Sequence, residues 1–224
     1  MLANSTVVEV SFQSQPDLFW ALRGGGSNFG IITKVAMSTF AKPASYYTFQ
    51  GWGWTARQQV FKALSADTGA MPDGVSMIAT TIAWHSISKR FVISERYVGD
   101  AITRATSTAS YAPEPETRFG YCKTTLAMAE KMDRMNPDGY YNLFGSITVR
   151  NDAETYADIA DVFREEVHPA TKVDNIEFYT VFNPLTVRAI SRMKKRGGNA
   201  LGIEPKDGPL MGKLGRNASE TYVC

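Results

Sequence analysis

Apolar and polar positions follow the two periods of regular secondary structure along most of the chain. Alternation with a period of two predicts strands over residues 7–11, 29–40, 46–54, 74–84, 89–98, 140–149 and 176–182. A period of 3.6 predicts helices over residues 55–67, 123–135, 153–167 and 184–194. This order of elements predicts an α+β fold, in which helices cover one face of a mostly antiparallel sheet.

The helix over residues 153–167 has the clearest boundaries. Asp152 is a good N-cap residue because its carboxylate can accept a hydrogen bond from a free amide of the first turn. The apolar stripe expected to pack against the sheet is Tyr156, Ile159, Ala160 and Phe163.

Aromatic residues are frequent on the predicted strands. They include Tyr46, Trp52, Trp54, Tyr140, Phe144, Phe178 and Phe182. The sheet face that the helices leave free must meet something else, and such residues suit a ligand wall or a domain interface. Glu95, Arg96 and Tyr97 are placed together on one strand, where an exposed face is the default interpretation and contact with a substrate is the alternative.

A run of three glycines interrupts the first forty residues. Pro16 and Asp17 suit the first turn of a short helix, and Gly24, Gly25 and Gly26 end it because glycine accepts backbone angles closed to other residues. The run alone fits both a simple helix stop and a turn that binds a ligand. A Rossmann fingerprint does not fit, because there the glycines precede the helix and follow G-x-G-x-x-G. A Walker-type loop does not fit either, since no Gly-Lys-Ser/Thr follows.

Composition narrows the class of function. The chain has 224 residues and a net charge of +2, a balance that gives no reason to expect a nucleic-acid or membrane partner. Two cysteines and two histidines are too few for a disulfide framework or a closed zinc site, so no metal is expected. The first residues do not form a secretory signal, which makes a cytoplasmic location the default expectation.

The segment DLFWALRGGGSNFGIIT resembles the end of the flavin domain in FAD-linked oxidoreductases of the vanillyl-alcohol-oxidase and berberine-bridge-enzyme-like group, with an FAD-binding domain of the PCMH type. Two later stretches are similar to fungal members, MNPDGYYNLFGSITVRNDAETYADIADVFREEV and FNPLTVRAISRMKKRGGNALGIEPKDGPL. The resemblance covers most of residues 2–210.

The resemblance implies three parts: residues 1–42 as the end of the FAD-binding domain, residues 43–210 as an α+β substrate domain, and residues 211–224 as a divergent tail. It implies FAD as cofactor and a small-molecule substrate, whose hydride passes to the flavin and then to oxygen or another acceptor. The residues implied to line the flavin are Gly24, Gly25, Gly26, Ser27, Asn28, Phe29 and Gly30. In the family the sheet of the substrate domain forms a roof over the flavin ring, which we call the substrate roof. The candidates for it are Tyr141, Phe144, Phe178, Phe182 and Asn183. Complete relatives are often secreted.

Departures from the family pattern lead to two hypotheses. The family's phosphate-binding loop, and the histidine or cysteine that attaches the flavin, would lie before residue 7, and a further segment would follow Leu210. We therefore expect an incomplete FAD-dependent oxidoreductase that needs a missing flavin-domain segment, and no catalytic base is assigned. The alternative is a non-catalytic remnant, or a partner-dependent module that does not bind FAD on its own.

Overall fold

The computed structural model describes residues 1–39, 45–71, 75–99, 112–134, 140–173 and 176–220. The chain divides into two compact units. The smaller unit combines residues 1–41 with residues 186–208, and the larger combines residues 42–185 with residues 209–224. The sequence interpretation drew its boundaries differently, because it assigned the whole of residues 43–210 to one domain.

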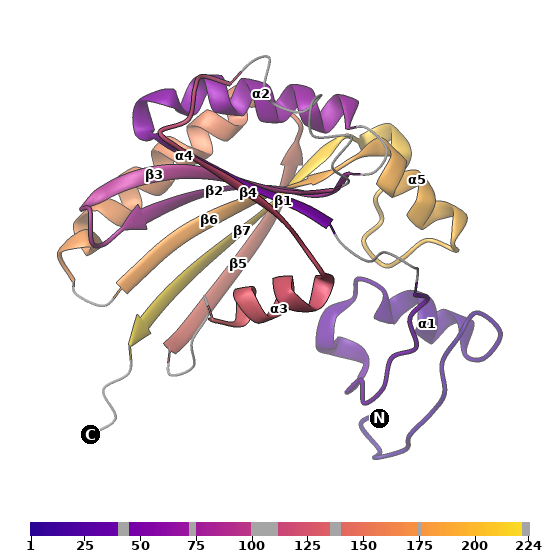
Figure 1. Ribbon diagram of the computed structural model, residues 1–224. Helices are drawn as coiled ribbons and strands as arrows, with labels where there is room; N and C mark the ends of the chain where they lie inside the picture. The colour runs from indigo at the N-terminus through magenta and orange to yellow at the C-terminus, as the bar shows by residue number, and fades with distance from the viewer. Residues whose placement is uncertain (40–44, 72–74, 100–111, 135–139, 174–175, 221–224) are drawn as a thin grey trace. The chain divides into compact units, whose positions relative to one another are not determined.

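The larger unit is built on a seven-stranded antiparallel sheet (Figure 1). Its strands are β1 (Ser45–Gly53), β2 (Val75–His85), β3 (Arg90–Gly99), β4 (Thr117–Lys123), β5 (Tyr140–Arg150), β6 (Ile176–Leu185) and β7 (Leu210–Glu220). Their order across the sheet is β4-β1-β3-β2-β6-β7-β5. The antiparallel α+β architecture predicted from the alternation is confirmed.

Helices lie on both faces of this sheet, but unequally (Figure 1). Helices α2 (Arg57–Ala70) and α4 (Ala153–Val167) cover one face. Helix α3 (Thr125–Arg134) lies on the other, where the Lys131 ammonium sits 5.5 Å from the ring centroid of Tyr47 and 5.2 Å from that of Phe119. We call the first face the helix-covered face and the second, which α3 covers only in part, the open face.

The main core lies between the sheet and the helices α2 and α4. Its fully buried members with large side chains include Phe61, Leu64, Ile82, Ile93, Tyr156, Phe182 and Met211. The ring of Phe182 on β6 lies 5.2 Å from that of Phe61 on α2 and 5.5 Å from that of Tyr156 on α4. Burial of large aromatic side chains of this kind is the main favourable contribution to folding.

The predicted cap of α4 is confirmed. The Asp152 carboxylate accepts a hydrogen bond of 2.7 Å from the Thr155 backbone N–H and another of 2.7 Å from the Thr155 hydroxyl. These hydrogen bonds hold the pKa of Asp152 below its ordinary value. Of the predicted stripe, Tyr156 and Ala160 are buried, and Ile159 and Phe163 pack partly buried against the core.

Most of the segment interpreted as a divergent tail, residues 211–220, belongs to a strand of the sheet, and residues 221–224 lie outside the described residues. Residues Leu210–Glu220 form β7, which pairs with β6 on one side and β5 on the other. The hydrogen bonds of a sheet come from the backbone, so a strand with partners at both edges needs no apolar alternation of its own. The polar sequence of this segment therefore gave no alternation from which the strand could be predicted.

In the described residues, the smaller unit contains two α-helices, α1 (Pro16–Leu22) and α5 (Val187–Lys195). Pro16 occupies the first turn of α1 and Asp17 follows it, as predicted. The strands predicted over residues 7–11 and 29–40 are not formed in residues 7–11 and 29–39, and residue 40 lies outside the described residues. A strand requires a run of hydrogen bonds to a neighbouring backbone, and residues 29–39 have such bonds in the described part of the chain only between Ile31 and Met1.

Candidate functional site

The glycine run forms a tight turn at the end of α1. The backbone φ angles of Gly24, Gly26 and Gly30 are 109°, 66° and 132°, values that residues with a side chain rarely adopt. The Gly25 N–H donates to the Ala21 carbonyl at 3.0 Å, which closes the last turn of the helix. A short 3₁₀ helix over Gly26–Phe29 follows. The geometry of the run is therefore that of a helix stop. Whether it can also bind a ligand depends on the surface that it exposes.

The outer surface of this turn is open. Gly24, Gly26, Ser27, Asn28 and Phe29 are exposed, while Gly25 and Gly30 are half-buried. A Cβ atom built on Gly26 would meet one atom within 4 Å, the Asn28 side-chain nitrogen at 3.9 Å. A flat ligand can approach the backbone closely at such a position, so the turn fits the flavin that the resemblance implies.

A second glycine-rich loop, residues 196–202, packs against the turn. The Arg23 Nη1 donates to the Arg196 carbonyl at 2.8 Å, and the Ala200 N–H donates to the Arg23 carbonyl at 3.0 Å. The Arg23 guanidinium also lies 4.4 Å from the centroid of the Phe19 ring. A Cβ atom on Gly24 would lie 2.8 Å from Leu201 Cγ. Sequence reasoning missed this loop, and its signal was the pair Gly197-Gly198 directly after a predicted helix.

A groove of about 620 Å³ lies on the open face of the larger unit. Its floor follows cross-strand pairs of small residues: Gly51 on β1 faces Ser94 on β3, which faces Thr81 on β2. Ala83, one pair further along β2, also lines the groove, and it faces Val92 on β3 and Tyr179 on β6. Small side chains in the middle of the sheet leave a hollow that larger residues at the edges enclose.

The candidates for the substrate roof divide between the two faces. Phe178 and Phe182 are 7% and 0% exposed and belong to the cores of the helix-covered face, so they do not line the open face. Asn183 is exposed on β6, and its side chain points opposite to that of Phe182 because strand residues alternate. Tyr141 and Phe144 lie on β5, and their side chains fall outside the described residues.

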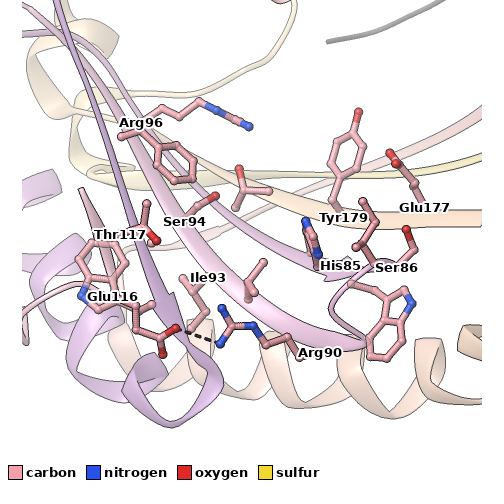
Figure 2. Close-up of a pocket in the computed structure, with 18 of the residues that line it drawn as sticks. His85, Ser86, Arg90, Ile93, Ser94, Arg96, Glu116, Thr117, Glu177 and Tyr179 are labelled. Atoms are coloured by element: carbon pink, nitrogen blue, oxygen red, sulfur yellow. Dashed lines mark hydrogen bonds and ion pairs between the residues drawn. The ribbon is translucent and has the colours of Figure 1, made fainter. Parts of the chain in front are cut away.

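Among the described residues that line the groove, four are charged: Arg90, Arg96, Glu116 and Glu177. Figure 2 shows Arg90 pointing toward Glu116, and the two side chains form an ion pair of 2.9 Å. Figure 2 also shows Arg96 and Ser94 toward one side of the view, with Glu177 and Tyr179 toward the other. Neighbours on the same strand, Glu95 and Tyr97, are buried on the helix-covered face at 2% and 3% exposure, so the substrate alternative applies to Arg96 alone.

Two further observations concern other kinds of site. Among the described residues, no cluster of three His, Cys, Asp or Glu side chains could hold a metal ion. In the same ranges no helix combines the length and the apolar character needed to cross a membrane. Burial raises the pKa of Tyr156, but its hydroxyl donates to Asn151 Oδ1 at 2.6 Å within the core of the larger unit.

Several known proteins similar to this chain carry FAD dependence in their names. An FAD-dependent monooxygenase of Fusarium proliferatum is 24% identical over 94% of the chain and 44% of its own length. The xylooligosaccharide oxidase of Thermothelomyces thermophilus is 40% identical over a shorter stretch, 34% of the chain and 17% of the oxidase. The chain is a homologue of FAD-linked oxidases and monooxygenases. No family model matches it.

Solved structures of FAD-linked oxidases share the fold. The xylooligosaccharide oxidase of Myceliophthora thermophila, solved in complex with xylobiose, superposes with a TM-score of 0.64 at 19% identity, covering 97% of the chain and 48% of the oxidase. A chitooligosaccharide oxidase gives a TM-score of 0.63 at 16% identity. The chain spans a little under half the length of the first relatives it matches. The fold is therefore that of one part of these oxidases.

Proposed function

We propose that this chain is part of an FAD-dependent oxidoreductase, in which the turn of residues 24–30 contacts the flavin and the open face of the larger unit binds a small organic substrate. The single observation that carries the proposal is the open glycine turn, with Gly26 at a φ of 66° and its Cβ direction almost empty. The similarity in sequence to an FAD-dependent monooxygenase over 94% of the chain, and to an oxidase over 34% of it, supports the proposal.

The roles of the two surfaces differ. FAD, when bound, would supply the chemistry of accepting a hydride and passing the electrons to oxygen or another acceptor. The residues of the turn would hold and orient the cofactor through close backbone contact, and the loop of residues 196–202 would support the turn from behind through Arg23. The groove residues would bind the substrate, and none of them is assigned as the catalytic base.

The test is a titration of the purified chain with FAD, followed by quenching of flavin fluorescence. Saturable quenching is expected, and Gly26→Ala is expected to weaken it because the new methyl group points to the side from which the flavin approaches. Gly202→Ala is a matched control, because the contacts of the supporting loop with the turn are made by Arg196, Ala200 and Leu201 and not by Gly202. The φ of Gly202 is 67° and a Cβ there meets no atom within 4 Å, so the backbone strain of the two variants is equal.

Two outcomes would contradict the proposal. One is the absence of saturable quenching at FAD concentrations on the order of 1 mM, which corresponds to a binding free energy of only about 4 kcal/mol. The other is equal weakening by Gly26→Ala and Gly202→Ala, which would show that strain in the smaller unit, and not contact at the turn, controls binding.

A non-catalytic or partner-dependent role is the second candidate, and one observation favours it. Ile31, Ile32, Val35 and Met37 are 62%, 57%, 64% and 81% exposed, an unusual concentration of large apolar side chains within residues 31–37. A partner polypeptide that covers this segment would bury them. A chain that fails to bind FAD alone but binds it after a partner is added would support this candidate against the autonomous one.

A further inference from the structure

Arg96 differs from Arg57, the other half-buried arginine among the described residues of the larger unit. Arg57 pairs with Asp161 and stacks near Trp54. Arg96 is half-buried on the open face, yet in the described part of the chain none of its nitrogen atoms has a hydrogen-bond or ion-pair partner. Its Nε atom is buried and unpaired. The terminal nitrogens of this half-buried guanidinium also have no acceptor in the described part of the chain, so they are the donors left for a ligand.

The surroundings of Arg96 are those of a built site. It lines the groove together with Thr81 and Ser94, whose side chains are 5% and 8% exposed. The Thr81 hydroxyl is buried and has no partner in the described part of the chain. Ser94 lies two residues from Arg96 on the same face of β3. Thr81 on β2 is the cross-strand neighbour of Ser94. Two polar groups without partners therefore lie close together at one hollow.

The charges of the groove select the ligand. Arg90 is already paired with Glu116, and Glu177 carries the one other negative charge among the lining residues that the structure describes. The groove is thus neutral overall, with one unpaired guanidinium. A planar guanidinium binds a carboxylate with two parallel hydrogen bonds, and a single cation suits a monoanion better than a phosphate dianion.

Next to this cation the groove has an aromatic edge. Phe49 on β1 is the cross-strand neighbour of Arg96, and its ring stacks on that of Phe119 with centroids 4.9 Å apart and planes at 14°. Phe49 lines the groove as Arg96 does. A ligand whose carboxylate meets the guanidinium would place its body against this ring.

We infer that the groove binds an organic carboxylate with an apolar or aromatic body, and that Arg96 is the residue that anchors the carboxylate. Its terminal nitrogens make the contact, because Nε is covered. The inference names a substrate class for the proposed oxidoreductase and takes its functional meaning from that proposal, but the binding it describes needs no flavin.

Benzoate is the probe, and benzamide is its neutral counterpart of the same shape. Both are titrated into the ¹⁵N-labelled chain without FAD, and the amide signals of Thr81 and Ser94 and the side-chain Nε–H signal of Arg96 are followed by NMR. Benzoate is expected to shift these signals saturably, and benzamide to bind about 10- to 100-fold more weakly, the range for loss of a charge-assisted contact. Inorganic phosphate is expected to bind more weakly than benzoate.

Three variants complete the test. Arg96→Gln is expected to weaken benzoate binding about 10- to 100-fold, and Arg96→Lys to weaken it less, since the charge stays but the planar fork is lost. Arg118→Gln removes the same charge from β4 at a residue outside the groove lining, and is expected to change binding less than about threefold because exposed charges are screened. Thermal unfolding of each variant shows that it is folded.

The inference is overturned if the Arg96→Gln variant binds benzoate as tightly as the unmodified chain does. It is overturned equally if the unmodified chain binds benzamide as tightly as benzoate. It is also overturned if phosphate binds as well as benzoate with the same dependence on Arg96, since the site would then be a general anion site. Its failure is distinct from that of the proposed function. Benzoate binding without FAD binding refutes only the flavin role, and FAD binding without benzoate binding refutes only the carboxylate site.

Discussion

Replacement of Phe182 tests the side of the sheet on which the core lies. Phe182 is 0% exposed, and its ring contacts those of Phe61 and Tyr156 with centroids 5.2 and 5.5 Å apart. Burial of a phenylalanine contributes about 1.5–3 kcal/mol, and the cavity left by its removal raises the cost of Phe→Ala to about 3–5 kcal/mol. The two aromatic contacts place Phe182→Ala in the upper half of that range.

The assay is urea unfolding followed by tryptophan fluorescence, since Trp52 is buried in the same core at 2% exposure. Asn183→Ala is the control, because Asn183 is the adjacent residue, is exposed and points to the opposite face. Its free energy of unfolding is expected to change by less than about 0.5 kcal/mol. A cost below about 1 kcal/mol for Phe182→Ala, at an unchanged slope with urea, would refute the placement of this ring in a closed core.

Three further predictions concern single groups. Thr80→Val is expected to raise the free energy of unfolding by about 1–2 kcal/mol in the same urea assay, because the Thr80 hydroxyl is buried without a partner in the described part of the chain; a loss of stability would show that it has one. Asp152→Ala is expected to lower the melting temperature more at pH 7 than at pH 3. The pKa of Asp152 is lowered in the folded chain, so its contribution is present above the unfolded-state value and is lost as the pH falls through the folded-state value; an equal effect at both pH values would contradict this. Arg23→Gln is expected to speed hydrogen exchange of amides in residues 197–202 while leaving those of α4 unchanged, because the bond to the Arg196 carbonyl is lost; unchanged exchange in the loop would count against the support of the turn by Arg23.

The period of apolar and polar positions predicted the secondary structure more accurately than the chemistry of single residues predicted the site. Alternation located β2, β3, β5 and β6, and the 3.6-residue period with an N-cap located α4 at the observed bounds. These elements bury one side against a core, so the pattern records their structure directly. The polar strand β7 has no such alternation, because backbone hydrogen bonds to its neighbours β5 and β6 hold it in the sheet.

The candidate site was predicted in part. The glycine turn follows from local rules, since a helix followed by glycines must end in a turn of positive φ. The substrate roof was assigned from aromatic size, but on a strand with one buried face the large apolar residues belong to the core, as Phe178 and Phe182 do. The groove instead consists of small and charged residues that alternate with them, such as Ser94 and Arg96. Only the cross-strand register brings these together.

The central claim is that the turn of residues 24–30 is a contact surface for FAD, and the most direct measurement is the FAD titration of the unmodified chain beside Gly26→Ala and Gly202→Ala. The account predicts saturable quenching of flavin fluorescence that Gly26→Ala weakens and Gly202→Ala leaves nearly unchanged, since the two glycines have φ angles of 66° and 67° and differ in the surface they occupy. No saturable quenching by the unmodified chain, or the same loss in both variants, would contradict it.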